Sequence, residues 1–138
     1  MSLAKHGYDT HLIVANQEIE NECGVQFHNI ISPTSGRIQR MRKTPQLAFD
    51  KAIEIDADIY HFHDPELLPV GLKLKKQGKK VIYDTHEDVP RQILSKYYIP
   101  SFVRPIIAKT FESYENRIAA KMDAVIAATP FILSLIHI

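Results

Sequence analysis

Two short stretches of the chain concentrate the side chains that could do chemistry. The first contains His61, His63, Asp64 and Glu66, and the second contains Asp84, His86, Glu87, Asp88 and Arg91. Imidazoles and carboxylates act as general acids and bases, as metal ligands and as hydrogen-bond partners of hydroxyl and phosphate groups. Four of the five residues 84–88 are ionisable, which is costly in an interior and unnecessary in a simple loop. We therefore expect a functional site, with His86 as its leading candidate.

Each polar stretch follows a run of apolar, β-branched or aromatic residues, which predicts a buried parallel strand. These strands begin at Ile59 and Val81, and residues 65–80 between them predict a helix that stops at Gly78. A strand, a helix and a second strand in this order place two parallel strands side by side. The polar stretches would then meet at the carboxyl edge of one sheet, where α/β proteins bind ligands.

The remaining sequence predicts an α/β fold with a doubly wound parallel sheet. Further strands are expected at 10–15, 25–31 and 123–128, the first and last of them buried, and helices at 37–55, 89–98 and 104–122. Pro45 can kink the first of these helices or restart it. Residues 1–7 have the pattern of a helix end, so we expect the domain, residues 1–132, to lack its first strand.

The C-terminal residues have a different character. Thr129 and Pro130 are typical of a helix start. The sequence that follows is apolar to its last residue without a cap, so we expect no helix to develop there. We interpret residues 133–138 as a non-native tail.

Composition limits the function classes. The 138 residues, 45% hydrophobic, suffice for one domain with a core, and the net charge of +1 argues against general nucleic-acid binding. Cys23 is the single cysteine, so there is no internal disulfide and no cysteine-based zinc site; we expect it to be inert. No apolar run reaches the roughly 18 to 20 residues of a membrane span, and residues 1–7 lack the apolar core of a signal peptide. These features predict a cytoplasmic protein.

Several of the polar residues also have a structural interpretation. Asp64 before Pro65 has the sequence of a helix N-cap followed by a first-turn proline. His61 and His63 lie two apart and share one side of a strand, where they could be hydrogen-bonded core histidines. A basic cluster, Arg37, Arg40, Arg42 and Lys43, is either a solvated helix face or a patch for anionic lipid headgroups or a phosphorylated substrate.

Two chemistries fit the His, Asp and Glu residues. One is a metal-dependent hydrolase, because imidazole and carboxylate suit Zn, Mn or Fe. Such enzymes usually carry further ligand motifs, such as Gly-Asp or Gly-Asn-His, and none occurs here. The other is hydrogen bonding to sugar hydroxyls and phosphate oxygens. A third, non-catalytic possibility is a receiver-like binding module, which would predict a clustered acidic pocket after the first strand instead.

Four segments together resemble the N-terminal domain of family-four retaining glycosyltransferases of the GT-B fold. They are residues 3–14, 61–69, 83–88 and 123–130; the second and third are fairly specific, and the other two are generic strands. The resemblance implies a Rossmann-like domain, the N-terminal half of a GT-B fold, that holds the acceptor. It places His86 near the donor sugar and the reaction centre, and His61, His63 and Asp64 on the acceptor side. We take Glu66, Asp84, Glu87, Asp88 and Arg91 as further substrate-binding candidates.

The resemblance also implies what the chain would do and what it lacks. The donor would be a nucleoside diphosphate sugar, the acceptor a sugar or lipid-linked molecule, and neither a metal nor another cofactor is expected. The pathway would be cell-surface polysaccharide or glycolipid synthesis. The family's donor domain carries two glutamates separated by seven residues, and no glutamates here have that spacing. We therefore expect this chain to be inactive without a donor domain.

Overall fold

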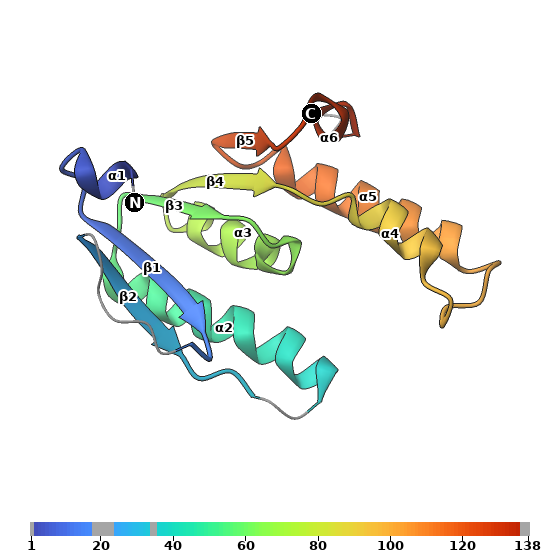
Figure 1. Ribbon diagram of the computed structural model, residues 1–138, viewed down its shortest axis with the longest axis horizontal. Helices are drawn as coiled ribbons and strands as arrows, with labels where there is room; N and C mark the ends of the chain where they lie inside the picture. Colours follow the sequence, from blue (N-terminus) through green and yellow to red (C-terminus); the bar gives the residue numbers. More distant parts are fainter. Residues whose placement is uncertain (1, 18–23, 34–35, 136–138) are drawn as a thin grey trace. The chain divides into compact units, whose positions relative to one another are not determined.

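The computed structural model describes residues 2–17, 24–33 and 36–135, and the chain forms two compact units, 1–57 and 58–138, which are treated separately here. Helices and strands are interspersed along the chain, and all three strand pairs among the described residues are parallel (Figure 1). The predicted α/β class with parallel strands is therefore confirmed. Cys23 lies outside the described residues, so its expected inertness stays a prediction.

The first unit consists of α1 (Ser2–Lys5), β1 (Thr10–Ala15), β2 (Val25–Ile30) and α2 (Arg37–Ile55). β1 and β2 pair from Thr10 opposite Val25 to Ala15 opposite Ile30, and α2 contacts both strands. The helix runs through Pro45 as a single element, so the predicted kink or restart does not divide it. It ends at Ile55, and the capping residue Asp56 has a left-handed backbone (φ 53°) and donates its N–H to the carbonyl of Ala52.

The second unit contains the predicted strand, helix and strand motif. Its elements are β3 (Ile59–Phe62), the 3-10 helix η1 (Pro65–Leu67), α3 (Leu68–Lys76), β4 (Lys80–Thr85), α4 (Val89–Ser95), α5 (Arg104–Ala119), β5 (Ala124–Ala127) and α6 (Pro130–Leu135). Its sheet has the order β3-β4-β5. After α3, Gly78 adopts a left-handed φ of 80° and the N–H of Lys79 donates to the carbonyl of Leu74, the helix stop expected from the sequence.

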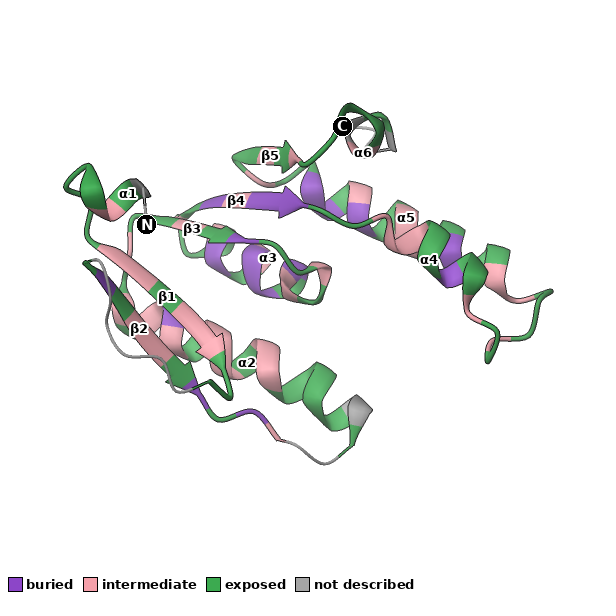
Figure 2. Cartoon of the chain, viewed as in Figure 1, coloured by how far each residue is buried: buried purple, intermediate pink, exposed green. Residues whose placement is uncertain are grey.

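The core of the second unit lies under β4. Val81 and Tyr83 are buried, as is Leu68 of α3, and Figure 2 shows β4 as the most buried strand of its sheet. Phe62 of β3 stacks on Tyr83 with ring centroids 5.2 Å apart. Gly71 of α3 faces the Phe62 ring. A Cβ at this position would lie 2.8 Å from Phe62 Cε1, which explains why the helix carries a glycine in its interior.

The single predicted sheet is described as two sheets, β1-β2 and β3-β4-β5. The first sheet belongs to the unit of residues 1–57 and the second to the unit of residues 58–138.

Two expectations were wrong. β1 and β5 are partly exposed rather than buried, with Leu12 45% and Ile126 45% accessible. Within the described part of the chain, β5 pairs with a strand, β4, on one side only, so its neighbours cover it less than they cover β4. A helix does develop after β5: α6 begins at Pro130, and the N–H of Ile132 donates to Thr129 Oγ1 at 3.2 Å. The cap and the first-turn proline were thus the stronger signal.

Candidate functional site

Strand alternation selects which polar side chains meet at the end of β3 and β4. The two strands pair in register up to Phe62 opposite Tyr83, so His63 and Asp84 follow directly beyond the last pair. Because side chains alternate between the faces of a strand, His61, His63, Asp84 and His86 project from one face. Phe62 and Tyr83 project from the other. The carboxyl edge of this sheet therefore gathers three histidines and one aspartate.

Asp84 is the centre of this group. His61 Nε2 lies 3.1 Å and His63 Nδ1 3.4 Å from its Oδ2, and His86 Nε2 lies 3.0 Å from its Oδ1. The Asp84 side chain is 11% exposed, whereas those of His61, His63 and His86 are 39%, 58% and 52% exposed. We call these four residues the histidine cluster. The alternative interpretation of His61 and His63 as packed core histidines is wrong, because both rings reach solvent.

The three rings of the histidine cluster also contact one another. The His61 and His63 centroids are 4.7 Å apart and those of His63 and His86 are 5.1 Å apart. His61 forms a hydrogen bond with Asp84, but the buried Oδ1 of Asp84 has no hydrogen bond, since the nearby His86 nitrogen does not approach it in hydrogen-bonding geometry. The cluster thus presents ring nitrogens at an accessible edge and a carboxylate oxygen with unused capacity beneath them.

Asp64 and Glu66 follow β3 but are not among the contacts of Asp84. Asp64 occupies the N-cap position of η1 with Pro65 in the first turn, as its sequence predicted. Its side chain makes no capping hydrogen bond, and its carbonyl accepts from the N–H of Leu67 at 2.9 Å instead. Both acidic side chains are exposed. They remain free to meet a ligand, and their substrate-binding role stays a prediction.

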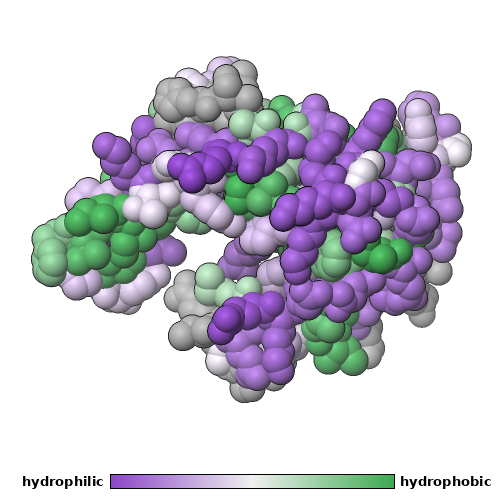
Figure 3. Space-filling view, turned by 180° about the vertical axis from the view of Figure 1, so that it is seen from behind, coloured by the Kyte–Doolittle hydropathy of each residue, from purple (hydrophilic) through white to green (hydrophobic). Residues whose placement is uncertain are grey.

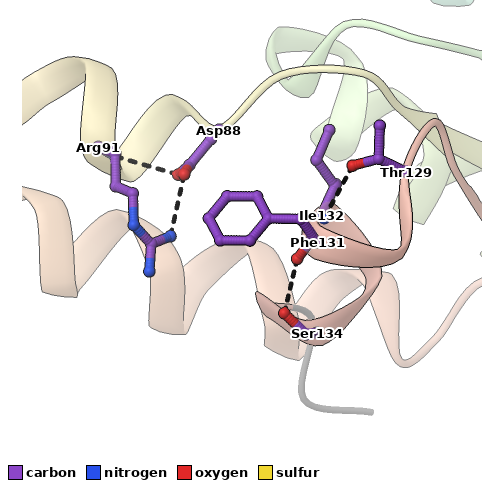
Figure 4. A network of polar contacts seen from close by, with 6 residues as sticks. All are labelled: Asp88, Arg91, Thr129, Phe131, Ile132 and Ser134. Atoms are coloured by element: carbon purple, nitrogen blue, oxygen red, sulfur yellow. Dashed lines mark hydrogen bonds and ion pairs between the residues drawn. The ribbon is translucent and has the colours of Figure 1, made fainter.

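Glu87, Asp88 and Arg91 form a second polar group that is separate from the histidine cluster. Asp88 caps α4 by accepting from the N–H of Arg91 at 3.1 Å, and it pairs with Arg91 Nη1 at 2.9 Å. Figure 4 shows Arg91 beside Asp88, and its guanidinium carbon lies 5.3 Å from the Phe131 ring centroid. Glu87 and Asp88 line an open hollow together with Thr85, Pro90, Glu112, Glu115, Asn116 and Ile132. These contacts give Asp88 and Arg91 a local structural role.

Comparison with known families decides which protein class this geometry belongs to. A sequence profile described as Glycosyltransferase Family 4 matches residues 1–137. The chain belongs to glycosyltransferase family 4. No curated protein and no solved structure matches it. The resemblance seen in the sequence is therefore confirmed over nearly the whole chain.

Membership of glycosyltransferase family 4 supports a transferase-type function with sugar donor and acceptor substrates. It gives no support to the metal-dependent hydrolase considered from the sequence. The parallel α/β architecture is consistent with a Rossmann-like half of such an enzyme. The donor, the acceptor and the pathway are more specific than the family itself.

Sequence reasoning missed a buried polar pair in this family-4 domain. Tyr83 OH donates to Glu115 Oε1 at 2.6 Å, and both residues are buried. Burial raises the pKa of the Glu115 carboxyl, and burial together with the Glu115 contact raises the pKa of Tyr83. A signal was present: Glu115 lies four residues after Phe111 and three before Ile118, within the apolar stripe of α5.

The basic cluster of the family-4 chain lies in the first turns of α2. Arg40, Arg42 and Lys43 are exposed, and the side chain of Arg37 lies outside the description. Among the described residues, no helix has the length and apolar character that crossing a membrane requires. Membrane contact through the basic cluster stays a prediction.

Proposed function

We propose that the chain is the acceptor-side half of a GT-B retaining glycosyltransferase. It would work with a second domain that binds a nucleoside diphosphate sugar, and it would be inactive without that domain. The observation that carries the proposal is the histidine cluster at the carboxyl edge of β3 and β4, within a chain of glycosyltransferase family 4. Ligands of open parallel sheets bind at such edges.

In this proposal the cluster positions hydroxyl groups around the reacting bond. His86 donates to or accepts from the donor sugar next to the anomeric carbon, and Asp84 at 3.0 Å keeps its ring near that place. His61 and His63, which share Asp84 Oδ2, bind the acceptor. The gain in rate comes from orientation and from electrostatic stabilisation of the departing diphosphate, whose positive groups the second domain would supply.

The reaction itself needs no metal and no other cofactor in this proposal. The donor is the nucleoside diphosphate sugar, and the acceptor is a sugar or a lipid-linked sugar of cell-surface polysaccharide or glycolipid synthesis, made on the cytoplasmic side of a membrane. Asp64, Glu66 and Glu87 are exposed after the ends of β3 and β4 and are the further substrate contacts. Asp88 and Arg91 form an ion pair with each other, so they would contact substrate while that ion pair stays in place.

The test is a transfer assay on the full-length protein with His86→Ala. We expect a loss of about 100-fold or more in kcat/KM, the range seen when one preorganised polar group at a reaction centre is removed. The melting temperature should stay near that of the wild type, because the His86 side chain is 52% exposed. His28→Ala, which removes an imidazole from β2, is the matched control and should retain activity. Retained activity with a large drop in melting temperature would contradict the role of His86.

Peripheral contact with anionic lipid is the proposed way of reaching a lipid-linked acceptor. The basic cluster on α2 is one candidate surface. A second is the connection between α4 and α5 together with the first turn of α5, where Tyr97, Phe102 and Ile106 are 89%, 77% and 65% exposed. Figure 3 shows a hydrophobic area at this end of the two helices. Residues 89–111 contain four basic and no acidic side chains, which complements anionic headgroups.

Liposome sedimentation separates these two surfaces. The double variants Arg40→Glu/Lys43→Glu and Phe102→Ser/Ile106→Ser are compared with wild-type protein on vesicles with and without anionic lipid. We expect binding only with anionic lipid and a loss in at least one variant. Equal binding by all three proteins would remove both surfaces from the proposal.

A further inference from the structure

The buried charge of Asp84 lacks a permanent positive partner. Its described charged or polar partners are the imidazoles of His61, His63 and His86, and neither a lysine nor an arginine pairs with it within the described ranges. A carboxylate held away from water is unfavourable unless a cation or hydrogen bonds compensate its charge. The charge of Asp84 is therefore compensated by these imidazoles only when they are protonated, and a bound cation would compensate it when they are neutral.

The positions of the ring nitrogens match those of metal ligands. His61 Nε2 and His63 Nδ1 lie 3.1 and 3.4 Å from the same carboxylate oxygen, and the three ligand atoms lie within 4.8 Å of one another. Bonds of about 2.0–2.1 Å in a tetrahedral zinc site hold neighbouring ligands roughly 3.3 Å apart. Small side-chain rotations would therefore be enough to bring all three onto one ion.

Two independent features support a ligand at this position. Asp84 is only 8% exposed, yet the one hydrogen bond of its carboxylate among the described residues joins His61 to the Oδ2 that His63 also approaches, and Oδ1 on the His86 side makes none. The His61 and His63 side chains are 39% and 58% exposed, which leaves an entry path from solvent. A pair of hydrogen-bonded core histidines would show neither feature.

We propose that His61, His63 and Asp84 form a binding site for one divalent transition-metal ion of the Zn²⁺ type. Two imidazoles and one carboxylate suit this class of ion, and three protein ligands leave a coordination position open. His86 contacts the other oxygen of Asp84 and stands outside the ligand set.

Metal binding would regulate the proposed transfer reaction rather than take part in it. An ion on His61 and His63 withdraws the nitrogens that the proposed function assigns to the acceptor, so Zn²⁺ should inhibit transfer and a chelator should restore it. This consequence rests on the proposed function. The binding site itself does not, because it can be measured without any substrate.

The experiment uses tag-free, full-length protein freed of metal with a chelator. Zn²⁺ binding is measured by calorimetry, and Co²⁺ binding by its visible ligand-field absorption. We expect one ion per chain, and His63→Ala and Asp84→Asn should each weaken binding more than the roughly 10- to 100-fold that changes around a ligand shell cost. His61→Asn serves as a second ligand variant should Asp84→Asn fail to fold.

Two control variants separate this site from general imidazole binding. His86→Ala removes a histidine of the same cluster that is not a ligand, and His28→Ala removes one of the stacked pair His11 and His28. His28→Ala should bind one ion with nearly unchanged affinity, and His86→Ala, which removes a contact of the ligand Asp84, should lose no more than the roughly 10- to 100-fold of a change around the ligand shell. Absence of ion binding by the wild type, or wild-type binding by His63→Ala, would overturn the site. Zn²⁺ binding without inhibition of an active enzyme would overturn the regulatory role alone. Loss of transfer in His86→Ala with Zn²⁺ binding retained would show that the metal site and the transfer reaction depend on different residues.

Discussion

The two faces of the β3 and β4 strands hold polar groups of opposite character. On one face the Asp84 carboxylate is surrounded by three imidazoles that are 39–58% exposed. On the other face the strand residue Tyr83 donates one hydrogen bond to Glu115 of α5, and both groups are buried. Neighbouring residues of one strand thus lead to an accessible polar edge and to a closed polar contact.

The two faces differ in whether their polar groups still have hydrogen-bonding capacity for a ligand. The buried Asp84 Oδ1 makes no hydrogen bond, and the rings above it are open to solutes. On the opposite face, the Tyr83 hydroxyl has its partner, and the Phe62 ring fills the space beside it. Changes on the first face should therefore alter binding and activity, and changes on the second should alter the free energy of unfolding.

The largest expected effect concerns the centre of the accessible face. Asp84→Asn keeps the size of the side chain but removes the charge around which the three imidazoles are arranged. We expect kcat/KM in the full-length protein to fall by about 100-fold or more, while the melting temperature changes little, because a buried charge is lost together with its cost. A strongly lowered melting temperature with normal transfer would place Asp84 with the structural face.

On the closed face, Glu115→Ala removes the acceptor of the Tyr83 hydroxyl. The buried hydroxyl is then unsatisfied, and the free energy of unfolding should fall by about 1–3 kcal/mol, measured by urea denaturation. Glu115→Gln keeps an acceptor oxygen and is the matched control, with a much smaller loss. If kcat/KM of folded Glu115→Ala dropped as far as in Asp84→Asn, the division between the faces would fail.

Gly71→Ala tests the packing of the same face. The added Cβ would lie 2.8 Å from Phe62 Cε1, and Phe62 is backed by Tyr83, so the ring has little room to retreat. We expect a loss of about 1–3 kcal/mol in unfolding free energy from overpacking. Phe62→Leu in the Gly71→Ala background should recover part of that loss, measured as a double-mutant cycle. Additive effects would show that the two residues do not press on each other.

The smallest effect is a pH dependence of stability. Burial raises the pKa of Glu115 in the folded protein above its ordinary value of 4.5. At a pH between the ordinary pKa and the raised one, the folded state binds the proton and the unfolded state does not. The free energy of unfolding should therefore decline as pH rises through this window. Glu115→Gln should lack this decline when both proteins are denatured with urea over a pH series. The same slope in both would assign it to another group.

Local sequence signals predicted most elements of the fold to within a few residues. The strands β1 and β2 and the helix α2 begin at the predicted residues, and Gly78 stops α3 as expected. The uncapped ending was misjudged, because the cap formed by Thr129 and Pro130 is sufficient to begin α6. The exposure of β1 and β5 was also missed, since apolar content does not reveal what covers a strand.

The sequence by itself determined that His61 and His63 share one side of a strand and that a second polar group follows the next strand, because the period of two is a local property of extended chain. Only the tertiary structure decided that Asp84 gathers three imidazoles and that Glu87 and Asp88 line a hollow that does not include these imidazoles. It also decided that Tyr83 meets Glu115, which lies 32 positions further along the chain. Such meetings depend on strand register and helix packing, which no local pattern specifies.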